Sequence, residues 1–137
     1  MASIRKEVLL RARPEDVWAA VRDVGAIHIR LVPGFVVDCR LDGDARIVTF
    51  ANGVTARELI VDINERDRRL VWAAVGGRLT HHNASVQVFA EGVAASRLVW
   101  IADLLPNELA PSIEVMIEQG IGAMKKALDH NAAAGRA

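Results

Sequence analysis

The sequence predicts an α+β fold in which a curved antiparallel sheet wraps around one long C-terminal helix. Six strand-like segments follow one another with short turns, and the only long helical pattern comes after them, from Pro106 to His130. Connections this short join antiparallel neighbours, because a parallel pair needs a crossover of about a dozen residues or more. A helix of about 20–24 residues is roughly 30–36 Å long and can cross a whole sheet. A curved sheet around such a helix can leave a hollow, where we expect the functional site.

The N-terminal part is predicted to form one strand and two short helices. Ser3–Arg11 mostly alternates apolar and charged residues, as a strand with one buried face does. Pro14 suits the first position of a helix, and the acidic residues after it favour the positively polarised end of that helix. A second short helix is predicted over Asp23–Leu31, before the stop signal Pro33-Gly34.

Turn-forming residues separate the strands that follow. Asp42-Gly43-Asp44, Asn52-Gly53 and Gly76-Gly77 are typical of hairpin connections. Together with the first strand, these segments predict a sheet of seven strands. The six later strands are predicted at Val36–Leu41, Arg46–Ala51, Thr55–Ile63, Leu70–Val75, His82–Ala90 and Arg97–Leu104.

The last helix carries one stripe of apolar or small residues. Pro111 lacks a backbone donor and belongs in the first turn, so the regular helix should begin near Ala110, after a looser turn at Asn107–Leu109. Gly120 on the stripe costs about 1 kcal/mol relative to Ala in a helix, and provides either close packing on the sheet or room for a ligand. The stripe consists of Leu109, Ile113, Met116, Ile117, Gly120, Met124, Ala127 and Leu128.

The composition bounds the class of protein. The 137 residues are expected to form one domain over residues 1–130, with a frayed tail at 131–137. A hydrophobic content of 52% excludes a disordered chain, and 17 basic against 17 acidic residues give no electrostatic case for nucleic acid. No apolar run approaches the roughly 18 residues of a membrane span, and the charged start is unlike a signal peptide, so we expect a cytoplasmic protein. The single Cys39 is predicted to be a buried hydrophobic residue.

Several segments together resemble the START-like, helix-grip proteins of the SRPBCC superfamily, which includes polyketide cyclase/dehydrase-type proteins. They are RPEDVWAAVRDV, ARELIVDINERDRRLVWAAVGG, HHNASVQV, RLVWIADLLP and GIGAMKKAL, in this order. The resemblance covers nearly the whole chain, and the part from Glu58 to Pro106 also looks like the plant abscisic-acid receptors. It implies a seven-stranded antiparallel sheet around the C-terminal helix, with an apolar cavity between them. The lysine that holds the receptors' ligand falls near Pro33, so no lysine anchor is implied.

Glu58 and the following histidines are the candidate polar groups of the hollow. Glu58 stands in an otherwise apolar strand and matches an acidic cavity position of the receptors; it could act as an acid, a base or a hydrogen-bond anchor, or instead face solvent or pair across the strand. Only one of His81 and His82 can enter the hollow, because adjacent strand residues point to opposite faces. Simple alternation favours His82, whereas the resemblance favours Asn83 and Ser85, together with His81.

The apolar lining is predicted from strand and helix residues. Trp72 matches an aromatic cavity position of the receptors, Ala74 shares its face, and Trp100 faces either the hollow or the end of the core. Methionines on the helix stripe suit a deformable wall. The predicted ligand-binding residues are Glu58, Trp72, Ala74, Asn83, Ser85, Trp100, Ile113, Met116, Ile117, Gly120 and Met124.

Two main functions follow from these predictions. The first is binding of a small hydrophobic or aromatic molecule, such as a lipid, in the hollow. The alternative is a polyketide cyclase, aromatase or dehydratase, in which Glu58 and His82 are the candidate catalytic acid–base pair. Neighbouring histidines on opposite faces make a poor metal site and no nucleotide motif occurs, so no cofactor is expected. A homodimer and a plain interaction module stay open, and partners in nucleic acid or within a membrane are not expected.

Overall fold

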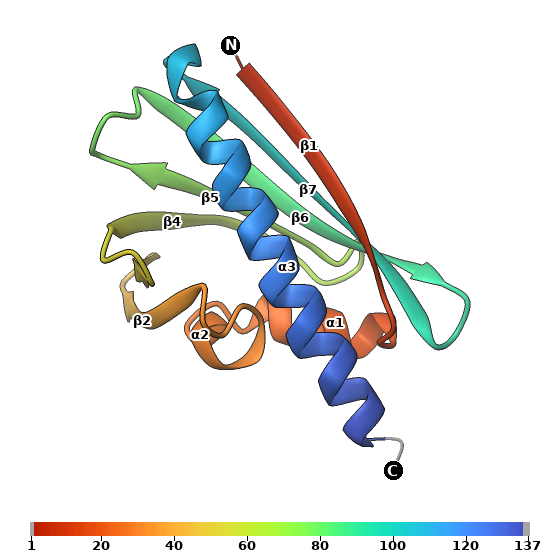
Figure 1. Cartoon of the computed structure of the whole chain (residues 1–137). Coiled ribbons are helices and arrows are strands. Elements are labelled where there is room, and N and C mark those ends of the chain that lie inside the picture. Colours follow the sequence, from red (N-terminus) through yellow and green to blue (C-terminus); the bar gives the residue numbers. More distant parts are fainter. Residues whose placement is uncertain (1, 136–137) are drawn as a thin grey trace.

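The structure is a computed structural model that describes residues 2–135, and it confirms a seven-stranded antiparallel sheet around a long C-terminal helix (Figure 1). The sheet order is β1-β7-β6-β5-β4-β3-β2, so β1 and β2 are its two edges. The elements are β1 (Ala2–Leu10), α1 (Pro14–Arg22), α2 (Ile27–Arg30), β2 (Val36–Asp42), β3 (Ala45–Phe50), β4 (Thr55–Asn64), β5 (Arg69–Val75), β6 (His81–Glu91), β7 (Ala95–Leu105), a 3₁₀ turn (Asn107–Leu109) and α3 (Ala110–Gly135).

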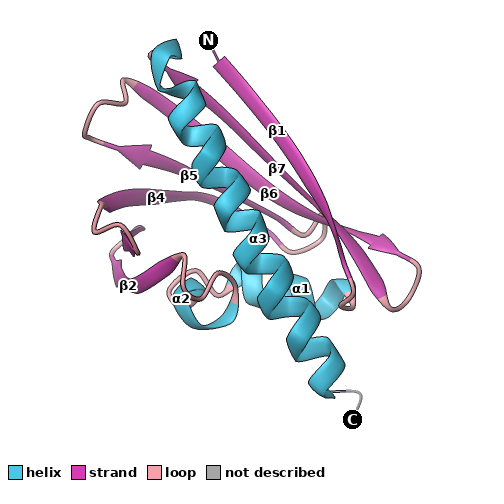
Figure 2. Ribbon diagram, in the orientation of Figure 1, coloured by secondary structure: helices cyan, strands magenta, loops and turns pink. Residues whose placement is uncertain are grey.

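Five hairpins run from β2 to β7, and β1 then pairs with β7, so the first strand lies beside the last. Figure 2 shows α3 crossing one face of this sheet diagonally, with α1 and α2 at one end of the same side. The helix therefore lies over strands that are far apart in the chain, and the space beneath it is shared by both halves of the sheet.

The helix start was predicted correctly, but two other boundaries were wrong. The looser turn at Asn107–Leu109 is a 3₁₀ turn, and the regular helix begins at Ala110. The same helix continues to Gly135, so the tail expected to fray from residue 131 is helical that far. The second helix covers only Ile27–Arg30, and the residues before it form a turn. This turn packs tightly on β2, since a Cβ added to Gly25 would lie 2.9 Å from Leu41 Cγ.

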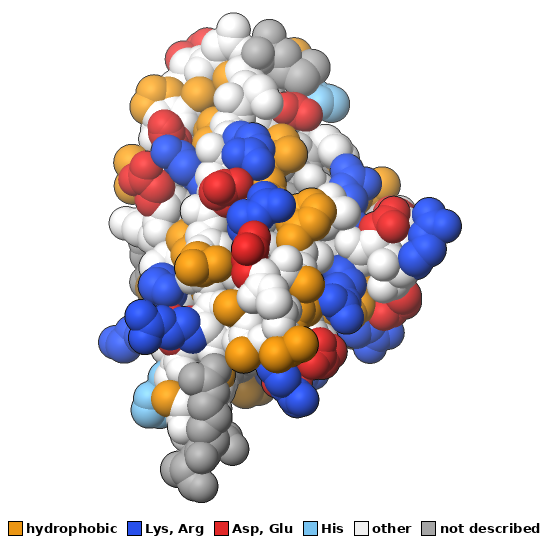
Figure 3. Space-filling model, turned by 90° about the vertical axis from the view of Figure 1, so that its right-hand side faces the viewer, with side chains coloured by type: hydrophobic (Ala, Val, Ile, Leu, Met, Phe, Trp, Pro, Cys, Tyr) orange, Lys and Arg blue, Asp and Glu red, His pale blue; other side chains and the backbone are white. Residues whose placement is uncertain are grey.

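One deeply buried part of the core lies where α1, β1, β7 and the later half of α3 meet. Leu10, Val17, Val21, Leu98 and Met124 are at most 1% exposed there. Cys39 on β2 is also buried, as predicted, and burial raises the pKa of its thiol. The outer surface is mixed in charge: the face in Figure 3 shows acidic and basic side chains intermingled with scattered apolar ones.

Candidate functional site

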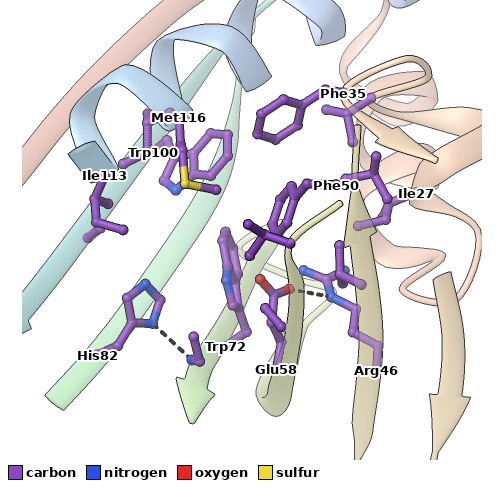
Figure 4. Close-up of a pocket in the computed structure, with 18 of the residues that line it drawn as sticks. Ile27, Phe35, Arg46, Phe50, Glu58, Trp72, His82, Trp100, Ile113 and Met116 are labelled. Atoms are coloured by element: carbon purple, nitrogen blue, oxygen red, sulfur yellow. Dashed lines mark hydrogen bonds and ion pairs between the residues drawn. The ribbon is translucent and has the colours of Figure 1, made fainter. Parts of the chain in front are cut away.

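A cavity of about 290 Å³ lies between the first half of α3 and the concave face of the sheet, and its walls are mostly apolar. Strands β3 to β7 form its floor, α3 its roof, and α2 with the following loop one side (Figure 4). Nine of the predicted side chains line it, and they are Glu58, Trp72, Ala74, His82, Trp100, Ile113, Met116, Ile117 and Met124. The hollow predicted from the resemblance is therefore present.

Two aromatic pairs shape the cavity. The rings of Trp72 and Trp100 meet edge to face, with centroids 5.8 Å apart and planes at 64°. Phe35 and Phe50 form a second edge-to-face pair at 5.3 Å and 65°. Phe35, Phe50 and Met116 also line a wider groove on the outside, so they separate the inner cavity from the surface. Edge-to-face rings fix one another's orientation, which makes these walls well defined.

Glu58 faces the cavity and is held there by an ion pair. Arg46 Nε lies 2.8 Å from Glu58 Oε1, and both side chains are largely buried, at 4% and 12% exposed. The Arg46 guanidinium also lies 5.4 Å from the centre of the Trp72 ring and donates from Nη1 to the Val24 carbonyl at 3.4 Å. Burying a charge is costly unless it is paired. Arg46 thus allows a carboxylate to stand in an apolar wall.

His82 faces the cavity from β6 and is held in one protonation state. The N–H of Ala74 donates to His82 Nδ1 at 2.9 Å, so that nitrogen carries no proton and the neutral ring has its proton on Nε2. Burial, with His81 nearby, lowers the pKa of His82 although Asp103 acts in the opposite direction. His82 therefore offers an N–H donor, whereas Glu58 offers a carboxylate acceptor.

The His82 bond exists because the sheet opens at this point. Pairing of β5 with β6 ends at Trp72 and Ala84, although β4–β5 pairing continues to Val75 and β6–β7 pairing starts at His81. The Ala74 N–H has no partner on β6 and donates to the His82 imidazole instead. Between Val75 and the start of β6, Gly76 and Gly77 adopt positive φ angles of 88° and 64°, which suit glycine.

Glu58 and His82 do not form a direct acid–base pair. Glu58 lies opposite Ala74 on β5, and His82 lies on the strand after β5, so the backbones of their strands are about two strand spacings, or roughly 10 Å, apart, while the imidazole reaches back to the Ala74 N–H. Figure 4 shows them on either side of Trp72, with the Glu58 carboxylate turned to Arg46. A single molecule in the cavity could contact both groups, and no hydrogen bond joins them directly.

Three predicted site residues lie elsewhere. Asn83 and Ser85 do not line the cavity, since His82 enters it and neighbours on a regular strand alternate. The lean towards these two, which came from the resemblance, was wrong about their direction. Gly120 provides close packing rather than room: a Cβ there would meet Trp100 at 3.0 Å and Phe35 at 3.3 Å.

Arg46, Phe35 and Phe50 were not predicted as site residues. Arg46 and Phe50 share one face of β3 with the buried Val48, and this period-two spacing was a signal that Arg46 points inward. Phe35 lies in the loop before β2, where periodicity gives no guidance.

Metal and membrane features are not found in the part of the chain that is described. Among residues 2–135, no three His, Cys, Asp or Glu side chains come together as a metal site would need. In the same range, no helix combines the length and the apolar character of a transmembrane span.

A curved antiparallel sheet that holds a long helix over an apolar cavity defines the START-like, helix-grip class of proteins. The comparison with protein families agrees: residues 1–135 match the family described as polyketide cyclase/dehydrase and lipid transport. The chain belongs to this family. No curated protein matches the sequence.

Solved structures show the same fold. A solution structure of a protein from Thermobifida fusca is 28% identical, with a TM-score of 0.78, and the match covers 98% of this chain and 95% of that one. A Thalictrum norcoclaurine synthase point mutant, in complex with a transition-state analogue, is 20% identical with a TM-score of 0.74 over 99% and 96% of the chains. The di-domain aromatase/cyclase BexL of the BE-7585A biosynthetic pathway is 14% identical with a TM-score of 0.81, over 94% of this chain and 47% of that one.

Proposed function

We propose that this protein binds a small, uncharged, largely aromatic molecule in the cavity beneath α3. The observation that carries the proposal is the pair of fixed polar groups in a mostly apolar wall: the Glu58 carboxylate as acceptor and the His82 Nε2–H as donor. Sites for small molecules commonly combine apolar walls with a few polar groups that orient the ligand.

The charge of the wall supports an uncharged ligand. The Glu58 charge is already balanced by Arg46, and the neutral His82 ring adds none. Arg78 also lines the cavity, but it is exposed and can meet a charge only at the mouth. Deeper in the space of about 290 Å³, an ionised group would have no partner, which is unfavourable. A hydroxyl donating to Glu58 and a carbonyl or ether oxygen accepting from His82 complement both groups. The roughly 10 Å between the two strands that carry them suits a molecule of one or two rings.

Binding can be tested with N-phenyl-1-naphthylamine, an uncharged aromatic probe whose fluorescence rises in apolar surroundings. Ala74 lies in the cavity wall between the two polar groups, so Ala74→Leu should fill the space and weaken probe binding at least roughly tenfold. Ala73 is the matched control, because it is the adjacent alanine on the other face of β5. Ala73→Leu should leave binding unchanged. No binding to the wild type, or equal binding by both variants, would contradict the proposal.

A cyclase or aromatase function is the second candidate, and the neutral His82 donor in the cavity supports it. A hydrogen bond from Nε2 could polarise a substrate carbonyl, while the Glu58 carboxylate, about two strands away, accepts a proton from another carbon or hydroxyl of the same substrate. Incubation with a linear poly-β-keto thioester, followed by mass spectrometry, would show loss of two hydrogens and an oxygen as water if ring closure and dehydration occur. His82→Gln and Glu58→Gln should abolish that product while the neutral probe still binds; product unaffected by both would exclude this function.

A further inference from the structure

The two edges of the sheet are protected to very different degrees. At the β1 edge, Lys125 of α3 donates from Nζ to the Leu9 carbonyl at 2.8 Å, and Asp129 accepts from the Arg11 backbone N–H at 2.8 Å. Lys6 on the same strand forms an ion pair with Glu118 at 3.1 Å. The long helix thus packs along β1 and occupies a backbone acceptor at its C-terminal end, which hinders pairing of this edge with another strand.

At the β2 edge, the turn at Val24-Gly25 packs on the inner side chains Cys39 and Leu41, but no described residue bonds the outward backbone groups. A two-residue turn closes the β2–β3 hairpin at the pair Asp42–Ala45, so Asp42, Arg40 and Asp38 direct their backbone groups to β3. Cys39 and Leu41 then direct theirs away from the sheet, and no other backbone group within residues 2–135 bonds to them. The apolar side chains of Val37 and Leu41 at this edge are 54% and 60% exposed. A strand of this kind can accept another strand.

The side chains of β2 select a second copy of the same strand. When two β2 strands run antiparallel around Cys39, Asp38 of each copy lies opposite Arg40 of the other, and Val37 lies opposite Leu41. The outward backbone groups of Cys39 meet the same groups of the other copy, while Leu41 lies beside Val37, where the β2–β3 register shifts between Val36 and Asp38. Shifting the centre to Asp38 or to Arg40 would place that charge opposite itself, which is destabilising.

Asp38 and Arg40 are free to make these contacts. Both are exposed on the face away from the cavity, and neither takes part in an ion pair with another of the described residues. By contrast, the neighbouring Asp42 is already bound to Arg57 at 2.6 Å, so a register that needs Asp42 competes with an existing pair.

We propose that this protein forms a two-fold symmetric dimer in which the β2 strands of two copies pair antiparallel around Cys39, joining the two sheets into one. Such an interface is isologous, since each copy offers the same strand. The cavities lie on the concave faces, and the dimer leaves both of them accessible because only edge residues are used. This inference does not depend on the proposed ligand.

The test uses charge reversal and sedimentation velocity. Arg40→Asp places acidic residues opposite Asp38, and Asp38→Arg places basic residues opposite Arg40, so each variant alone should dimerise roughly tenfold more weakly or worse. Arg40→Asp is acidic at positions 38 and 40, and Asp38→Arg is basic at both. In a one-to-one mixture these two chains complement each other, and a mixed dimer should form. Arg66→Asp, at an 89% exposed position in the β4–β5 turn, is the matched charge change elsewhere and should dimerise as the wild type does.

Recovery in the mixture is the decisive result, because a variant that simply failed to fold could not recover. A wild type that stays monomeric at its highest soluble concentration, or a dimer that both reversals leave intact, would overturn the proposal. Amide hydrogen exchange gives an independent measurement: the Cys39 and Leu41 amides should be protected at high protein concentration and exchange quickly at low concentration. Equal exchange at both concentrations would count against the β2 pairing.

Discussion

Glu58 and His82, two polar side chains of the cavity wall, are compensated in different ways. Glu58 is a charge that is neutralised by another buried charge, Arg46 at 2.8 Å. His82 is an uncharged ring, held by the backbone N–H of Ala74 at 2.9 Å. The first arrangement is costly to disturb because either partner alone would be a buried charge. The second can be lost by adding one proton. The cavity wall at Glu58 is thus held by two paired charges, whereas the wall at His82 is sensitive to pH.

The largest effect should come from breaking the ion pair. Arg46→Met leaves the Glu58 carboxylate buried without its partner and should lower the free energy of unfolding by about 3–5 kcal/mol, measured by urea denaturation. The double variant Arg46→Met/Glu58→Leu should recover most of the loss, since no charge is then left unpaired. Arg57→Met, which breaks an exposed pair between β4 and Asp42 of β2, should have only a small effect. Equal losses for Arg46→Met and Arg57→Met would show that the Glu58 pair is not buried.

A smaller effect should follow from removing the imidazole. His82→Phe keeps a ring in the wall but leaves the Ala74 N–H without an acceptor, at a cost of about 1–3 kcal/mol. His82→Gln offers a carbonyl oxygen as acceptor, and its loss in the same urea measurement should be smaller. If glutamine were no better than phenylalanine, the hydrogen bond to Ala74 would not be what stabilises this end of the cavity.

The smallest effect is a pH dependence that belongs to His82. Its pKa is lowered on folding, mainly by burial, so the unfolded chain binds a proton more readily than the folded one. The contribution of neutral His82 to the free energy of unfolding is complete above the ordinary histidine pKa of about 6.5. It is lost as pH falls towards the lower pKa of the folded state. The wild type should therefore lose more stability than His82→Gln between neutral and mildly acidic pH. Parallel pH profiles for the two proteins would contradict this assignment.

The overall fold was predictable because it depends on the periodicity of apolar residues and on the turn-forming residues between the elements. Strands of alternating character, glycine-containing turns and one long apolar stripe are local signals, and together they determine the order of elements. Pro111 even located the change from a 3₁₀ turn to regular helix at Ala110. Most of the cavity wall followed, since Trp72, Ala74, Ile113 and Met116 lie on predicted inward faces.

The site was less predictable where it depends on partners across the sheet. Alternation alone identified His82 as inward, but the sequence does not show that β5 and β6 separate after Trp72, which is what gives the imidazole its backbone partner. A pair across the strand was one alternative for Glu58, but its partner was not identified, because Arg46 and Glu58 are opposite each other only in the β3–β4 register. The role of Gly120 depended on the direction of the Trp100 ring, which no sequence spacing specifies.

The contact of Trp100 with Gly120 has a consequence for how such a cavity can evolve. The indole lies against the bare backbone of α3 and also lines the cavity, so one side chain determines both the helix-to-sheet spacing and the depth of the space. A smaller residue at 100, together with a larger one at 120, would exchange volume between the packed contact and the cavity without touching Glu58 or His82. The size of the accepted molecule could therefore diverge among descendants of this chain through two coupled substitutions, while the polar groups that orient it are inherited unchanged.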